Sequence, residues 1–213
     1  MSIQQKALDK VAELKLPILP VIKVNTVDEI IPIAETLIEG GILGLEITLR
    51  TDAGLDAIKL AKERFSNAIV SAGTVTTPFQ LEQVVDAGVD FTVTPGLSAE
   101  LLETAEKLGA ALLPGVATPS EIMLAKSHGL QRCKLFPASI VGGMGMLKAM
   151  QGPFPSMSFC PTGGLNADNF MDYLSLENVF CIGGTWMLCS TDGKFDPALS
   201  AKAIASIHQS MQA

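Results

Sequence analysis

The sequence lacks several features that would point to particular classes of protein. No stretch is apolar over the roughly 18 residues that a membrane-spanning helix needs, although hydrophobic residues make up 48% of the chain. With 15 basic and 22 acidic side chains, the formal net charge is −7. A nucleic-acid footprint needs a clustered basic face, so we expect neither a nucleic-acid nor a membrane partner. Charges spread through the first 17 residues predict no secretory signal and favour a cytoplasmic protein.

Cysteine and histidine are also scarce. The four cysteines show no CxxC spacing and three lie in apolar runs, so we expect buried, reduced thiols. The chain has two histidines, His128 and His208, and both fall in helical stretches. We therefore expect no histidine-built metal site, no histidine general base and no cofactor. The Walker, HExxH and GxSxG motifs are absent as well.

What the sequence does contain is a regular alternation of short apolar runs and amphipathic stretches. The apolar runs predict strands at 17–24, 42–49, 68–72, 90–94, 110–114, 132–136, 157–161 and 178–182. Amphipathic stretches, several of which end in glycine, predict helices at 26–41, 53–65, 98–109 and 119–129. We expect further helices before the first strand and at 197–212.

Eight strands, each followed by a crossover segment, predict a (β/α)8 (TIM) barrel with an extra N-terminal helix, formed as a single domain by residues 1–213. A doubly wound open sheet is the structural alternative, but such a sheet usually has fewer strands. No linker or low-complexity tract divides the chain. Because active sites of barrels lie at the carboxyl ends of the strands, polar residues late in each strand are the candidates for function.

The sixth predicted strand, within "QRCKLFP", contains one charged side chain among apolar neighbours. Side chains alternate along a strand, so Lys134 shares a face with Phe136, and we expect this face to point into the barrel. Burial disfavours the ammonium form, and a neutral amine is a nucleophile. The alternative is a lysine that merely pairs with a buried carboxylate. Lys23, at the end of the first strand, is a rival amine, but its place near the rim favours a solvated group or an anion contact.

The second predicted strand, within "LEITLR", carries Glu46 with Thr48 and Arg50 on the same face. Strands two and six are both even-numbered, so their inward side chains can share a layer of the barrel. We therefore expect Glu46 within reach of Lys134, where a carboxyl group can transfer a proton. A simple ion pair would fit the same spacing. The planar guanidinium of Arg50 suits a substrate carboxylate.

Two glycine pairs, in "PTGGLNADN" and "IGGTW", follow the last two predicted strands. Many barrels bind phosphate at this place, on backbone N–H groups and a short helix N-terminus. Paired glycines allow the main chain to approach an anion closely, although tight turns use them too. We therefore expect two glycine turns that together form a phosphate site.

The chain resembles the bacterial 2-keto-3-deoxy-6-phosphogluconate (KDPG) and 4-hydroxy-2-oxoglutarate (KHG) aldolases in the motifs "LEITLR", "SAGTV", "TPGL", "LLPGV", "KLFPA", "GPFPSMSFCPTGG" and "CIGGTW". The match runs in register from about the first strand to "GGTW". It implies a lysine-dependent (class I) aldolase on a small (β/α)8 barrel, a homotrimer without metal. The implied partners are a 2-keto acid substrate, pyruvate and a phosphorylated aldehyde.

The resemblance also implies a role for each candidate residue. Lys134 is then the Schiff-base lysine, Glu46 the acid/base, and Arg50 the residue that holds the pyruvate carboxylate. The remaining site comprises Thr74, Pro95, Phe136 and Thr162 around pyruvate, and Gly163, Gly164 and Thr185 at the phosphate end. Two positions depart from the family: Ser139 stands where many relatives have an acidic residue, and Lys23 stands where the family varies.

The implied reactions are cleavage of KDPG to pyruvate and glyceraldehyde 3-phosphate, and of KHG to pyruvate and glyoxylate, both through an imine on Lys134. Three alternatives remain at this stage. One is a non-catalytic barrel that binds a phosphorylated metabolite. Another is a related aldolase for a different 2-keto-3-deoxy sugar acid, such as phosphogalactonate. The third is a metal-dependent sugar-phosphate epimerase, whose histidines this chain lacks at its strand ends.

Overall fold

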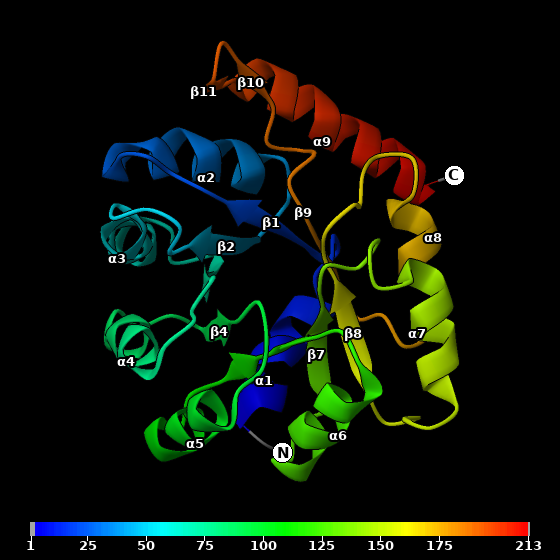
Figure 1. Cartoon of the computed structure of the whole chain (residues 1–213). Coiled ribbons are helices and arrows are strands. Elements are labelled where there is room, and N and C mark those ends of the chain that lie inside the picture. Colours follow the sequence, from blue (N-terminus) through cyan, green and yellow to red (C-terminus); the bar gives the residue numbers. More distant parts are fainter. Residues whose placement is uncertain (1–2, 213) are drawn as a thin grey trace.

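The computed structural model describes residues 3–212, in which strands alternate with helices (Figure 1). The barrel strands are β1 (Ile18–Ile22), β2 (Gly44–Thr48), β3 (Ile69–Gly73), β4 (Phe91–Val93), β5 (Leu112–Leu113), β6 (Gly115–Val116), β7 (Arg132–Leu135), β8 (Ser158–Pro161) and β9 (Ile182–Gly184). The helices are α1 (Ile3–Ala12), η1 (Val27–Glu29), α2 (Ile30–Glu39), α3 (Gly54–Arg64), α4 (Pro78–Asp86), α5 (Ala99–Leu108), α6 (Pro119–Ser127), α7 (Gly143–Gln151), α8 (Phe170–Leu174) and α9 (Pro197–Gln212). A hairpin of β10 (Ser190–Thr191) and β11 (Lys194–Phe195) precedes α9.

Neighbouring barrel strands pair in parallel and close into a ring. One sheet has the order β5-β4-β3-β2-β1-β9 and the other the order β6-β7-β8. Only Pro114 separates β5 from β6, and Thr162, directly after β8, forms a parallel bridge with Gly183 of β9. Counting β5 and β6 as one interrupted strand, the ring has the eight strands that the sequence predicted. The (β/α)8 barrel is therefore confirmed.

Toward the amino ends of the strands, the barrel interior is apolar. A buried cluster there joins strand residues to two side chains of α1; its members are Leu8, Val11, Leu19, Phe91, Val93, Ala111, Leu113, Cys160 and Cys181. Asp9 of α1 also pairs with Arg132 of β7, at 2.6 Å between Oδ1 and Nη2. The extra N-terminal helix thus covers this end of the barrel, and polar chemistry is left to the carboxyl ends.

A second, larger core lies between the strands and the helices around them, with side chains such as Ile47 and Ile122 fully buried. Helix starts are fixed by hydroxyl caps, because Thr77, Ser98 and Thr118 each accept a hydrogen bond from the backbone N–H three residues later. A cap of this kind contributes about 1 kcal/mol. Within residues 3–212, we find no helix with the length and apolar character needed to cross a membrane.

The eighth strand differs from the sequence prediction. It was expected at 178–182, but β9 runs from Ile182 to Gly184, so the pair Gly183–Gly184 lies in a strand and the second predicted glycine turn is wrong. Neither glycine has a positive φ. Glycine is needed here for space, since a Cβ at Gly183 would overlap the Thr162 hydroxyl and one at Gly184 would overlap the Trp186 ring.

The four cysteines are free, and Cys133, Cys160 and Cys181 are buried, as predicted. Burial raises the pKa of the Cys133 thiol to about 12. Burial, followed by a hydrogen bond with Cys160, raises the pKa of Cys181 well above its ordinary value. Because the thiolate is the reactive form, Cys133 and Cys181 are inert at neutral pH and serve packing.

Candidate active site

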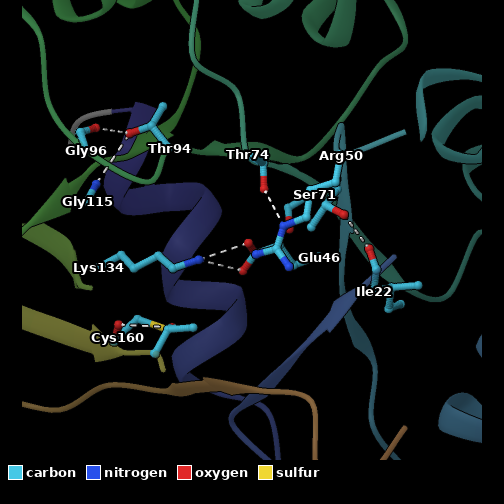
Figure 2. Close-up of polar contacts among 12 residues, drawn as sticks. Ile22, Glu46, Arg50, Ser71, Thr74, Thr94, Gly96, Gly115, Lys134 and Cys160 are labelled. Atoms are coloured by element: carbon cyan, nitrogen blue, oxygen red, sulfur yellow. Dashed lines mark hydrogen bonds and ion pairs between the residues drawn. The ribbon is translucent and has the colours of Figure 1, made fainter. Parts of the chain in front are cut away.

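Lys134 and Glu46 meet inside the barrel, as their spacing predicted. Lys134 comes from β7 and Glu46 from β2, and Figure 2 shows the two side chains extending toward one another. Nζ lies 3.0 Å from Oε1 and 3.4 Å from Oε2 of the carboxylate. The two side chains are only 5% and 2% exposed. Lys134, the lysine expected to point into the barrel, therefore has a buried carboxylate as its partner.

Two opposing effects set the charge state of this pair. Desolvation disfavours both the ammonium and the carboxylate, whereas their closeness favours the charged pair. Moving one proton from Lys134 to Glu46 gives a neutral amine and a neutral acid with no change in net charge. The contact therefore offers a direct route to the nucleophilic form of the lysine without a further base.

Phe136 lies beside the amine, as the strand alternation predicted. The Nζ of Lys134 is 5.3 Å from the centroid of the Phe136 ring. A cation over an aromatic face is attracted by the ring's quadrupole, and the ring also removes water from one side of the amine. Phe136 is half-buried at the carboxyl end of β7, so it can shield Lys134 and contact a bound substrate.

Pro95 follows β4 and reaches the strand next to Lys134. Gly115 of β6 pairs in register with Lys134, and a Cβ on Gly115 would overlap the backbone carbonyl of Pro95. Thr94, whose hydroxyl holds this turn, was not identified from the sequence. The Thr94 hydroxyl donates to the carbonyl of Gly96 at 2.6 Å and accepts from the N–H of Gly115 at 3.3 Å (Figure 2). A buried threonine directly before Pro-Gly in "TPGL" was the available signal.

Arg50 and Thr74 form a second contact at the ends of β2 and β3. The Arg50 Nε donates to the Thr74 hydroxyl at 3.3 Å (Figure 2). Thr74 has a φ of +61°, which is unusual for a β-branched residue and costs of the order of 1–3 kcal/mol. The guanidinium has five N–H donors in a planar fork, so it can engage a carboxylate while Nε contacts Thr74.

The first predicted glycine turn is confirmed. Gly163 and Gly164, directly after Thr162, have φ values of +98° and +82°. The turn is joined to the segment after β7, where the backbone N–H of Ser139 donates to the Gly163 carbonyl at 3.0 Å. Thr185 follows β9, the next strand of the ring, and is exposed. The candidate phosphate residues thus lie at neighbouring strand ends, and the two residues of the turn have a backbone conformation that favours glycine.

Lys23 directly follows β1. It is exposed and lines a hollow of about 350 Å3 that is also bordered by Ile33, Cys189 and Lys194. Its position near the rim, predicted from the sequence, is confirmed. Neither histidine approaches a strand end: His128 contacts Glu106 at 2.8 Å, and His208 contacts the carbonyl of Gly40 at 2.8 Å.

Groups of three or more His, Cys, Asp or Glu side chains that could hold a metal ion are not found in the part of the chain that the structure describes. The chemical resources of the site are therefore one amine, one carboxyl group, one guanidinium, hydroxyls and backbone N–H groups. Such a set suits covalent catalysis through an imine.

Comparison with known proteins agrees with this chemistry. The family described as "Aldolase: KDPG and KHG aldolase" matches residues 10–197. The 2-dehydro-3-deoxy-phosphogluconate aldolase of Dickeya dadantii is 43% identical over 194 residues, which is 89% of this chain and 91% of the relative. The enzyme of the same name from Pseudomonas aeruginosa is 51% identical, over 80% of this chain and 78% of the relative. The KHG/KDPG aldolase of Escherichia coli is 45% identical, over 81% of both.

Solved structures of KDPG aldolases have the same fold as this chain. The 2-keto-3-deoxy-6-phosphogluconate aldolase of Zymomonas mobilis, crystallised with 3-phosphoglycerate, aligns with a TM-score of 0.88 at 40% identity and covers 95% of each chain. The KDPG aldolase of Legionella pneumophila, with pyruvate captured as a covalent carbinolamine, aligns with a TM-score of 0.82 at 40% identity over 93% of each chain. Because the sequence match spans most of the barrel and the fold agrees, this chain belongs to the KDPG and KHG aldolase family.

Proposed function

We propose that this chain cleaves KDPG to pyruvate and glyceraldehyde 3-phosphate, through an imine on Lys134. The observation that carries the proposal is the 3.0 Å contact between Lys134 and Glu46, both buried, inside a barrel of this family. We propose cleavage of KHG to pyruvate and glyoxylate as a second reaction of the same site, because the Escherichia coli relative is named for both substrates.

The first step needs a neutral amine. Once Glu46 has accepted a proton, Lys134 Nζ attacks the C2 carbonyl carbon of the 2-keto acid and forms a carbinolamine. Protonation of the new hydroxyl releases water and leaves a protonated imine. The Legionella relative was captured with pyruvate at the carbinolamine stage, which supports this sequence of events.

The second step breaks the C3–C4 bond. The proton of the C4 hydroxyl is removed as the bond electrons move into the cationic imine, which gives the aldehyde and an enamine. We assign the base to Glu46, acting directly or through a water molecule. The same group then returns a proton to the enamine carbon, and hydrolysis of the imine releases pyruvate and restores the lysine.

Substrate placement follows from the other residues. Arg50, held by Thr74, is assigned to the carboxylate of the 2-keto acid, with which a guanidinium can form two parallel hydrogen bonds. Thr162, Pro95 and Phe136 are assigned to the pyruvate portion. The assigned phosphate contacts are Gly163, Gly164 and Thr185, where backbone N–H groups can approach an anion closely.

Borohydride trapping tests the proposal. Reduction in the presence of pyruvate should fix a pyruvate-derived mass on the peptide that carries Lys134. A barrel that only binds a phosphorylated metabolite would give no adduct. An adduct on Lys23, or none at all, would contradict the assignment. Separately, comparison of turnover on KDPG, KHG and phosphogalactonate would rank the substrates.

We also propose that the chain assembles as a homotrimer, as the family resemblance implies. Large apolar side chains are exposed and available to a partner subunit: Phe79 of α4 is 66% exposed, Met123 of α6 is 62% exposed, and Ile140 after β7 is 81% exposed. Light scattering coupled to size-exclusion chromatography should give three times the mass of the 22.4 kDa chain.

A further inference from the structure

Gly73, the last residue of β3, leaves empty the space into which the Glu46 side chain extends. A Cβ built on Gly73 would lie 2.5 Å from Oε1, 2.7 Å from Cγ and 3.0 Å from Cδ of Glu46. Real Cβ atoms essentially never approach another heavy atom to less than 3.0 Å. The catalytic carboxyl group therefore occupies the volume in which any other residue at position 73 would place its side chain.

Backbone conformation does not explain the glycine. Gly73 has no positive φ, whereas the next residue, Thr74, does. Gly73 pairs in register with Thr48 of β2 as an ordinary strand residue. An alanine could adopt this backbone without strain, so the absence of a side chain is needed here for room alone.

The backbone around Gly73 is poorly able to yield. The Gly73 carbonyl accepts a hydrogen bond from the N–H of Leu49 at 2.9 Å, and Gly73 is buried. Thr74 follows in a left-handed conformation and is tied to Arg50. Glu46, in contrast, has a flexible side chain, and its carboxylate lies 3.0 Å from Lys134. A methyl group at position 73 would consequently move the carboxylate before it moved β3.

We propose that Gly73 is a positioning residue for the reaction: its bare backbone forms the wall that keeps the Glu46 carboxylate within hydrogen-bonding distance of Lys134. The inference rests on the proposed function, because it takes Glu46 as the proton-transfer group. It adds a specific requirement, which is that the residue at 73 must lack a Cβ for proton transfer at the pyruvate methyl group to be fast.

Gly73→Ala tests this requirement. We expect exchange of the pyruvate methyl protons for deuterium, followed by NMR, to slow by roughly 10- to 100-fold, since a 1 Å misplacement of a catalytic group can cost about 100-fold. The KM for pyruvate should change by less than about threefold, because Arg50 holds the carboxylate. The borohydride adduct on Lys134 should still form.

Gly44→Ala is the matched control. Gly44 lies on the same face of β2, two residues before Glu46, and a Cβ there would lie 2.6 Å from Leu19 Cδ2 and 3.2 Å from the Ile18 carbonyl. Gly44→Ala adds the same methyl group as Gly73→Ala and produces a comparably close contact, but against the apolar side chain of Leu19. We expect it to lower the melting temperature without slowing exchange. Equal loss of exchange in both variants would overturn the proposal.

A double variant tests the coupling directly. Glu46→Ala removes the Cγ, the Cδ and the carboxylate oxygen that a Cβ at position 73 would meet. Gly73→Ala combined with Glu46→Ala should then exchange no more slowly than Glu46→Ala alone. Multiplication of the two losses would show that the residues act independently and would also overturn the proposal.

A folding defect in Gly73→Ala would not end the test. If the clash with Glu46 is the cause, Gly73→Ala combined with Glu46→Ala should melt within a few degrees of Glu46→Ala alone. Continued instability would show that the methyl group meets something else, and the proposal would fail. The proposed function has a separate failure: wild-type chain without a Lys134 adduct, or Glu46→Gln with undiminished exchange, would reject the mechanism itself, whatever Gly73→Ala does.

Discussion

The two halves of the barrel interior are built from opposite kinds of residue. At the amino ends, Leu8, Phe91 and Leu113 belong to a buried apolar cluster with no charged member. At the carboxyl ends, Lys134 and Glu46 are just as deeply buried, at 4% and 1% exposure, and are held by one another. Leu113 and Lys134 are both buried, so burial alone does not distinguish residues of the scaffold from residues of the site. What separates them is whether the buried group carries a charge that needs a partner.

The largest effect on turnover is expected from replacing the amine of Lys134. Lys134→Arg keeps a positive charge beside Glu46 but removes the nucleophile, because a guanidinium stays protonated. We expect turnover to fall by at least roughly 1,000-fold, with the melting temperature nearly unchanged. Steady-state kinetics with KDPG, together with a thermal scan, check this. Activity at the wild-type level would mean that Lys134 only balances Glu46.

The opposite outcome is expected in the apolar half. Phe91→Ala removes a ring that is 1% exposed and leaves a cavity, which should destabilise the fold by about 3–5 kcal/mol. Chemical denaturation measures this loss. Turnover per folded molecule should remain close to that of the wild type. A specific loss of turnover at full stability would show that the two halves are not separable.

Glu46→Gln distinguishes a proton-transfer group from a structural carboxylate. The amide keeps the volume of the carboxyl group but cannot accept the proton, so exchange at the pyruvate methyl should slow by about 100-fold, within the range typical of general acid–base catalysis. The KM for pyruvate should change by less than about threefold, as expected for a group that acts in the transition state. Parallel loss of binding and exchange would identify Glu46 as a structural carboxylate.

The smallest effect concerns the cysteines. At pH 8 the Cys133 thiol, whose raised pKa is about 12, is protonated in all but about one molecule in ten thousand, and only the thiolate is alkylated. Iodoacetamide should therefore modify the half-buried Cys189 first, with little change in turnover. Peptide mass mapping over time checks the order. Early modification of Cys133 would show that the barrel opens more readily than its packing indicates.

The sequence predicted the barrel and its central pair because both depend on simple periodicities. Alternation along β7 placed Lys134 and Phe136 on one face, and the layered order of barrel strands placed Glu46 across from them. The same reasoning misassigned Gly183 and Gly184, because glycines that make room and glycines that make turns look alike in a sequence. The role of Gly73 was not apparent from the sequence either, because Glu46, the neighbour that requires its small size, lies 27 residues away in the chain.

The helix α1 has a practical consequence for anyone who shortens this chain. The family match begins at residue 10, which would make that position a natural boundary for a trimmed version. Leu8 is fully buried and Asp9 forms an ion pair with Arg132. A chain that begins at residue 10 would lack both contacts, and the apolar interior at the amino ends of the strands would be exposed to solvent. The shortened protein would keep every residue assigned to catalysis and would still be prone to aggregate.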